Sequence, residues 1–142
     1  MLGRNIANAI TIFLAGSAIG KMHESWAAKQ DQAASEGEGD NQHFALMHHM
    51  TAGLKSYGTE MCYVGIDELR QACGGAGFLL SSGIADWWSD IAPYPTFEGV
   101  NPVMTQQASR LIFKQLKAAQ KGKKVLPLFS YLKDTKAILE SG

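Results

Sequence analysis

The side chain with the clearest chemical potential is the carboxylate of Glu98, in the segment 96–99 (Thr-Phe-Glu-Gly) just before a predicted helix. An apolar setting favours the neutral form of a carboxyl group, whereas the free amides of a helix N-terminus favour its charged form. Proteins use such opposing effects to tune a general base. A purely structural contact with those free amides is the alternative role. The apolar neighbours expected around Glu98 are aromatic: Trp87, Trp88, Tyr94 and Phe97.

The four histidines do not show the spacing of a metal site. His23-Glu24 begins like the helix of a zinc protease, but Ala27 stands where the second histidine is required. His48 and His49 are adjacent, so they lie about 100° apart on a helix and cannot share a metal-binding face. His43, the fourth histidine, has no acidic residue at a spacing typical of metal ligands. We therefore expect no metal.

Residues 74–77 (Gly-Gly-Ala-Gly) form the densest glycine cluster. They follow a predicted helix instead of a strand, so they lack the context of a dinucleotide-binding fingerprint. Glycine accepts the left-handed conformation that helix ends often need. From the residues alone, this cluster is read as a helix terminus.

Two long helices, over residues 2–31 and 42–73, are expected to position these groups. In each one, apolar residues recur at intervals of three and four, which places them on one helix face. A polar, acidic stretch at 35–40 separates the helices, and Asp40 or Asn41 is expected to cap the second. The two stripes are Ile6, Ile10, Phe13, Leu14, Ala18 and Met22, then Met47, Met50, Leu54, Tyr57, Met61 and Val64.

Three glycines interrupt the second long helix: Gly53, Gly58 and Gly65. Each costs about 1 kcal/mol of helix propensity relative to alanine. Their presence favours a close approach of neighbouring helices at these positions.

Shorter helices are expected in the rest of the chain, first around residues 84–90. A further helix begins with Asn101 as its cap and Pro102 at its first position. A final weak helix is expected over residues 128–139. Strand-like alternation is absent from the sequence, so we expect one all-α domain over residues 1–142, an antiparallel helical bundle. The buried face of the helix after Asn101 should be Met104, Ala108, Leu111, Ile112 and Leu116.

Composition excludes some classes of function. With 13 basic and 13 acidic residues the formal net charge is zero, and a nucleic-acid partner is not expected. Cys62 and Cys73 make neither a zinc site nor a disulfide framework, which favours a reducing compartment. The apolar run at 6–19 resembles a signal peptide or a mitochondrial presequence, but the helical pattern continues beyond it. It is short for a bilayer, so we expect a core helix and no membrane span.

Six short motifs, taken in order and spacing, are similar to those of the acyl-CoA oxidase family. The wider acyl-CoA dehydrogenase group shares only the glycine turn and the aromatic-Glu-Gly sequence, so the combination is specific to the oxidases. The similarity extends over nearly the whole chain. The motifs lie at residues 51–55, 70–78, 82–84, 96–104, 109–111 and 130–132.

The resemblance implies the first C-terminal helical domain of an FAD-dependent oxidase that converts acyl-CoA and O2 into trans-2-enoyl-CoA and H2O2. Glu98 takes the position of the family's catalytic base. Gln71, Gly74 and Gly75 match the turn that approaches the FAD of a neighbouring subunit. Arg110 matches a family arginine and is the candidate for substrate binding. The resemblance also implies acyl-CoA as the substrate, a homodimer or larger assembly, and a peroxisomal location.

The chain also departs from the family pattern. Ala76 stands where oxidases usually carry histidine, and Val100-Asn101-Pro102 replaces the usual Glu-Asn-Thr. The family's β-domain is lacking, so 142 residues are too few for activity alone. The last residues, 140–142, are not a peroxisomal signal, and a mitochondrial location is the alternative. A shortened, non-catalytic relative acting as a structural subunit is the second functional hypothesis beside the enzyme fragment.

Overall fold

The computed structural model describes residues 2–33 and 41–134, and over these ranges it consists of helices without a β-strand. The all-α prediction is confirmed. The long helices begin and end within two residues of the predicted bounds. The α-helices are α1 (Leu2–Ala33), α2 (Asn41–Ala72), α3 (Ile84–Ile91) and α4 (Asn101–Gln120), and the 3-10 helices are η1 (Gly74–Gly77), η2 (Leu80–Ser82) and η3 (Pro127–Asp134).

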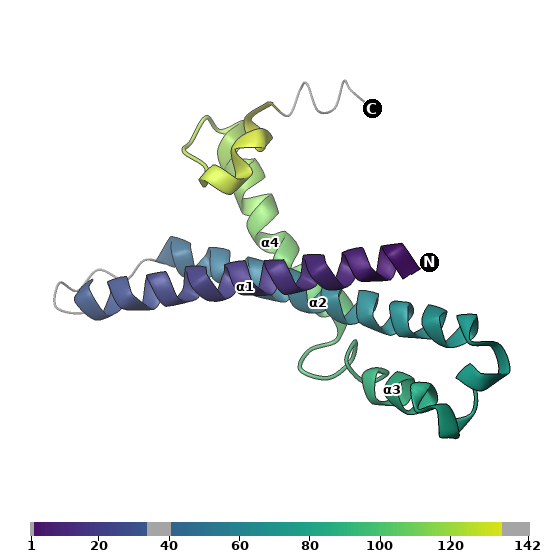
Figure 1. The fold of residues 1–142 in the computed structure, drawn as a ribbon. Helices are drawn as coiled ribbons and strands as arrows, with labels where there is room; N and C mark the ends of the chain where they lie inside the picture. The colour runs from purple at the N-terminus through teal and green to yellow at the C-terminus, as the bar shows by residue number, and fades with distance from the viewer. Residues whose placement is uncertain (1, 34–40, 135–142) are drawn as a thin grey trace.

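Helices α1 and α2 lie side by side and antiparallel (Figure 1). The close approach that the sequence predicted is found at Gly65, where the neighbouring helix leaves no room for a side chain. A Cβ added at Gly58 would lie 3.7 Å from a methyl group of Ile12, and one added at Gly65 would lie 2.8 Å from Asn5 Oδ1. Glu68 of α2 also forms a salt bridge with Arg4 near the start of α1. A methyl group would therefore make an ordinary van der Waals contact at Gly58, but at Gly65 it would force the Asn5 side chain to move.

The face of α1 that packs on α2 differs from the predicted stripe. Among the residues of α1 whose burial is described, Ile19 is the one buried apolar residue, and Ile12 is half-buried. Much of the predicted stripe is exposed to solvent: Ile6, Ile10, Phe13 and Leu14 are between 54% and 73% accessible. The physical reason is that, in the described part of the chain, α1 packs mainly on α2, and one neighbour can cover only part of a wide apolar surface. The periodicity identified an apolar helix but not which side its neighbour occupies.

Helix α4 crosses α2 at a steep angle and projects away from the α1–α2 pair, and η3 curls back on its far end (Figure 1). At the crossing, a Cβ added at Gly53 would lie 3.8 Å from that of Ala108. The core cluster lies farther along α4, where Leu111 packs with Phe129 and Leu132 of η3. The predicted buried face of α4 is confirmed, since all five of its residues are buried or half-buried.

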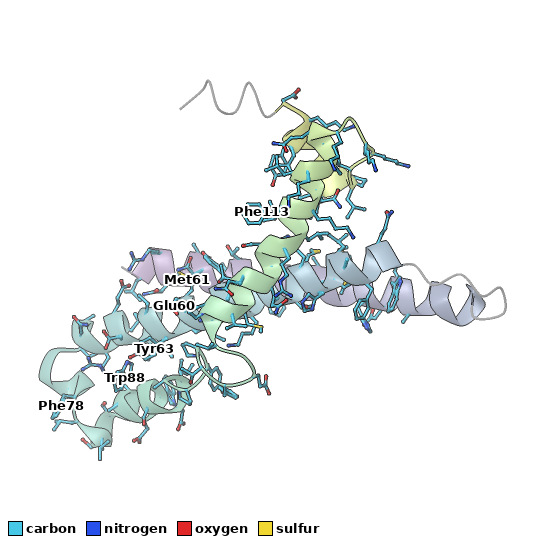
Figure 2. The ribbon with its side chains drawn as sticks, turned by 180° about the vertical axis from the view of Figure 1, so that it is seen from behind. Glu60, Met61, Tyr63, Phe78, Trp88 and Phe113 are labelled. Carbon is cyan, nitrogen blue, oxygen red and sulfur yellow. The ribbon has the colours of Figure 1, made fainter. Side chains whose placement is uncertain are left out.

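Helix α3 returns along the C-terminal half of α2. Trp88 of α3 faces Tyr63 of α2, with ring centroids 5.9 Å apart, and the guanidinium of Arg70 lies 5.4 Å from the Trp88 ring (Figure 2). Aromatic and cation–π contacts of this kind hold a short helix that is too small to be stable alone.

Two local predictions need correction. Val100, not Asn101, is the N-cap of α4, and no side chain caps this helix. The Asn101 side chain points instead toward α2, where it has four partners. The final helix is a 3-10 helix, and it is kinked at Phe129, whose backbone is non-helical (φ −106°, ψ 16°). The rest of that prediction and the Asp40 cap lie outside the described residues.

The stretch Leu2–Ala28 of α1 is long and apolar enough to cross a membrane by length and composition. This stretch is longer than the apolar run at residues 6–19 because the helix continues beyond residue 19 without a break. Signal sequences near an N-terminus and packed helices of soluble proteins meet the same criterion. The finding by itself does not place α1 in a membrane.

Candidate active site

Glu98 lies at the tip of a short loop that closes on itself. The Asn101 amide donates a hydrogen bond to the Pro95 carbonyl over 2.9 Å, and the Phe97 amide donates to the Pro93 carbonyl over 3.0 Å. The loop leads directly into α4, which starts at Asn101. Its closing bond therefore couples the position of Glu98 to the start of that helix.

The backbone at the tip of this loop is strained. Glu98 has a φ of 55° and is the one non-glycine residue with positive φ in the described part of the chain. Such a conformation costs a residue with a Cβ about 1–2 kcal/mol and is concentrated at functional sites. Gly99 follows with a φ of 101°, and a Cβ there would lie 2.6 Å from Met104 Cε. The backbone therefore requires glycine at position 99, whereas the glutamate at position 98 is held against its backbone preference.

The surroundings of Glu98 are more open than the sequence suggested. Glu98 is exposed in this chain, so the expected apolar burial is wrong for the chain alone. Tyr94 and Phe97 do lie near it, as an edge-to-face pair with centroids 5.0 Å apart. Trp88 packs on α2 instead, and Trp87 lines a separate apolar cavity near the start of α1. Burial of Glu98 requires surface that residues 2–33 and 41–134 do not supply.

Lys55 of α2 binds the loop from the side. Its Nζ donates to the Gly99 carbonyl over 2.6 Å and to Asn101 Oδ1 over 3.0 Å. Lys55 is half-buried and its stem lines an open groove of about 580 Å³ between α1, α2 and Tyr94. A charged donor in a partly desolvated place forms a strong hydrogen bond.

Asn101 is the buried polar residue at this junction, with 8% of its surface accessible. Its Oδ1 accepts from Lys55 and lies 3.0 Å from the Thr59 hydroxyl, which also lies 2.8 Å from the Lys55 carbonyl. Its Nδ2 donates to the Ser56 carbonyl over 3.1 Å and to Glu60 Oε2 over 3.2 Å. Figure 2 shows Glu60 beside the start of α4. The amide thus has a partner for each of its hydrogen-bonding positions.

Sequence reasoning missed this role of Lys55 and Asn101. Both stand in motifs that carry the family resemblance, and that was the available signal. The helix-start position of Asn101 suggested a cap, which is the common local use of asparagine. Only the crossing of α4 over α2 brings the two residues together.

The predicted flavin-contacting residues lie at the other end of α2. Gln71 is exposed, and its Nε2 donates to Asp67 Oδ2 over 2.7 Å. Gly74 has a φ of 57°, as expected for a glycine ending a helix, and a Cβ added at Gly74 or Gly75 would meet nothing within 4 Å. The next glycine is different, because a Cβ at Gly77 would lie 1.9 Å from the Arg70 carbonyl oxygen. Gly74 and Gly75 therefore present open backbone, while Gly77 is needed for packing.

The two candidate sites are far apart within the chain. Lys55 of α2 contacts the Glu98 loop, and Ala72 is the last residue of α2 before the glycine turn. With a helix rise of about 1.5 Å per residue, these two residues lie roughly 25 Å apart. Gln71 and Glu98 therefore cannot share one small pocket in a single chain. Arg110 is exposed on α4, roughly 13 Å along the helix from Asn101 by the same rise. The structure brings neither Gln71 nor Arg110 to the Glu98 loop.

Two of the described histidines make contacts between helices. His43 stacks on Trp26 with centroids 5.2 Å apart, and His49 Nδ1 donates to the Ala108 carbonyl over 2.6 Å. Cys62 and Cys73 are free thiols. Over residues 2–33 and 41–134, no three His, Cys, Asp or Glu residues are grouped as metal ligands.

Comparison with known proteins decides the family. Residues 1–113 match the model of the acyl-CoA oxidase C-alpha1 domain. The chain belongs to the acyl-CoA oxidase family. It is 43% identical over 100 residues to mouse peroxisomal acyl-coenzyme A oxidase 1, covering 70% of this chain and 15% of that one. The human protein of the same name is 38% identical over 98 residues, covering 69% and 15%.

This acyl-CoA oxidase family chain thus spans about 15% of the length of the curated relatives it matches. The family match includes the Glu98 loop, the Lys55–Asn101 contact and the glycine turn. It ends at residue 113, within α4, so the similarity of residues 130–132 lies outside it.

Proposed function

We propose that this chain supplies the general base and part of the flavin site of an FAD-dependent acyl-CoA oxidase. The observation that carries the proposal is the conformation of Glu98: a carboxylate in a left-handed conformation at the tip of a closed loop, in a chain of this family. A residue bearing only a capping or solubilising role needs no such strain. The exposed carboxylate faces outward, available to a substrate held by the rest of the enzyme.

The glycine turn fits a large, flat cofactor such as FAD. Gly74 and Gly75 leave free space where side chains would stand, and backbone can approach a pyrophosphate closely there. Gln71 presents an exposed amide beside them. The roughly 25 Å between this turn and Lys55 supports a division of labour in which the turn serves the flavin of a second subunit.

In the proposed reaction Glu98 removes the α-proton of the acyl-CoA thioester. Bound flavin would accept the β-hydrogen as hydride and pass the electrons to O2, which gives H2O2. A carboxylate in water is too weak a base for this carbon, so the site must exclude water when it is complete. Tyr94 and Phe97 provide the apolar side of that enclosure from this chain.

The chain alone is not expected to hold FAD. A few hydrogen bonds from Gln71 and the glycine turn contribute roughly 0.5–1.5 kcal/mol each. The freedom lost on binding costs about 4–15 kcal/mol. Absorbance of the purified 142-residue protein tests this, and a bound yellow flavin would contradict it.

The activity is tested in a hybrid enzyme: mouse peroxisomal acyl-coenzyme A oxidase 1 carrying residues 1–113 of this chain in place of its matching segment. We expect peroxide and enoyl-CoA production, and its loss in Glu98→Gln with flavin still bound, because the amide keeps the shape but cannot take a proton. Full activity in Glu98→Gln would sink the catalytic role. An inactive hybrid with full flavin would favour the structural-subunit hypothesis, to which Ala76, Val100 and Pro102 already point.

The relatives named above are called peroxisomal, and we propose the same location for this chain. We propose further that it works within a homodimer or larger assembly. The exposed apolar side chains of α1 support a covered surface in the complete enzyme.

A further inference from the structure

We propose that Lys55 and Asn101 are positioning residues for the catalytic base: together they hold the Glu98–Gly99 step in its left-handed conformation. The inference rests on the proposed function of Glu98. It adds two residues on elements that the reaction itself does not touch.

The first step of the argument is the strain. A glutamate at a φ of 55° returns to an ordinary conformation unless its neighbours hold it. On its C-terminal side, the next carbonyl is that of Gly99, and it is held by Lys55 Nζ at 2.6 Å. This contact restrains the peptide that directly follows Gly99. Rotation of the Glu98–Gly99 step would break it.

The second step is the base of the loop. The Asn101 amide closes the loop through its bond to Pro95, while its side chain anchors the same residue to α2. Loop closure and anchoring therefore meet in one residue. Rotation of the loop would have to break the backbone hydrogen bond from Asn101 to Pro95 and the side-chain hydrogen bonds from Asn101 to α2.

The third step is the fixed orientation of the Asn101 amide. Lys55 is a donor only, and it faces Oδ1 at 3.0 Å. The Glu60 carboxylate accepts at 3.2 Å and faces Nδ2. A flipped amide would turn donor toward donor and acceptor toward acceptor. The opposite charges of Lys55 and Glu60 thus allow one orientation of the Asn101 amide, which anchors the start of α4 to α2.

The test uses Lys55→Met in the hybrid enzyme. Methionine keeps an unbranched stem along the groove and removes the ammonium donor. We expect kcat to fall between about 10-fold and 100-fold, with KM changed less than about 3-fold, because a base misplaced by about 1 Å loses rate without losing substrate. The exposed Lys117→Met on α4 is the matched control and should keep the parent kcat.

A structural defect is separated from misplacement by α-deuterated acyl-CoA. If the base is misplaced, α-proton removal becomes more rate-limiting and the isotope effect on kcat rises in Lys55→Met. A lower kcat with unchanged isotope effect, in proportion to lost flavin, would mean fewer folded molecules and would overturn the inference. Should Lys55→Met not fold, Thr59→Val removes the hydroxyl that lies 3.0 Å from Asn101 Oδ1 and should give a smaller change in the same direction.

Failure of the inference is distinguishable from failure of the proposed function. Loss of activity in Glu98→Gln together with parent kcat and isotope effect in Lys55→Met overturns the inference alone. If Glu98→Gln stays active, the proposed function fails, and hydrogen exchange in the full 142-residue chain decides whether Lys55 holds the loop. There, Lys55→Met should speed exchange of the Asn101 amide at least about 3-fold. Unchanged exchange would overturn the holding role itself.

Discussion

The ammonium of Lys55 on α2 donates a hydrogen bond to the carbonyl of Gly99, 44 residues away, over 2.6 Å. This contact joins two motifs that are separate in the sequence, residues 51–55 and 96–104. The hydrogen bond restrains the carbonyl that follows the strained Glu98–Gly99 backbone. The candidate base and the residues that hold it therefore form one unit across the α2–α4 crossing.

Replacing Asn101 with alanine should destabilise the fold. The change leaves the half-buried Lys55 without one acceptor and removes the bonds to the Ser56 carbonyl and Glu60. We expect the free energy of unfolding to fall by about 1–3 kcal/mol, measured by urea denaturation of the 142-residue chain. Gln106→Ala, at an exposed position on the same helix, is the control and should change little. Equal effects for the two variants would contradict the assignment.

Stability and activity should change in opposite directions at Glu98. Glycine tolerates a φ of 55°, so Glu98→Gly should raise the free energy of unfolding by roughly 1 kcal/mol. Glu98→Gln retains a Cβ and should leave stability near that of the parent. Thermal unfolding of both variants compares them directly. A destabilised Glu98→Gly would show that the carboxylate or its stem makes stabilising contacts that outweigh the strain.

Two neighbouring glycines should respond differently to alanine. Gly77→Ala places a Cβ 1.9 Å from the Arg70 carbonyl oxygen, so the turn after α2 must rearrange and the unfolding midpoint should drop. Gly75→Ala meets nothing within 4 Å and should leave the chain folded as before. In the hybrid enzyme, however, Gly75→Ala should lower the flavin content, because the added methyl group occupies the space proposed for the cofactor. Full flavin in that variant would argue against the proposed contact.

Acid should loosen the end of α2. Hydrogen bonds from Arg70, and then from Gln71, hold the pKa of the Asp67 carboxyl below its ordinary value of 3.8. Because the folded-state pKa is the lower one, these bonds stabilise the fold above pH 3.8, and the contribution is lost as the pH falls through the folded-state pKa. Asp67→Asn should flatten the acid part of a circular dichroism titration, whereas Asp86→Asn on α3 should follow the parent. Superimposed curves for all three proteins would refute this.

The outer face of α1 should drive association of the isolated chain. Ile6, Ile10 and Phe13 are all more than half exposed along one helix, and contiguous apolar surface of this kind is typical of interfaces. We expect the 142-residue protein to self-associate in sedimentation velocity and Phe13→Glu to shift it toward monomer. Thr11→Glu, at an exposed polar position of the same helix, controls for added charge. A monodisperse parent monomer at high concentration would contradict the prediction.

Much of the fold follows from local sequence. Apolar residues at intervals of three and four set the lengths of α1, α2 and α4, and residues such as Gly74 and Pro102 set helix ends, because these effects act within a few residues. The close approach at Gly65 was also predictable, since a glycine inside a helix is costly without a neighbour to favour it. Glu98 became a candidate from its place between an aromatic residue and a glycine, and its proposed role as a base came from the family resemblance.

Only the tertiary structure decided which surfaces meet. The wide apolar face of α1 did not reveal which side α2 covers, because periodicity marks apolar residues without naming their neighbour. Asn101 satisfied every local rule for a helix cap, yet its side chain binds α2 instead. The Lys55–Gly99 bond and the left-handed Glu98 likewise depend on where α4 crosses α2. Hydrogen bonds between residues more than forty positions apart form after the helices pack, so no local pattern encodes them.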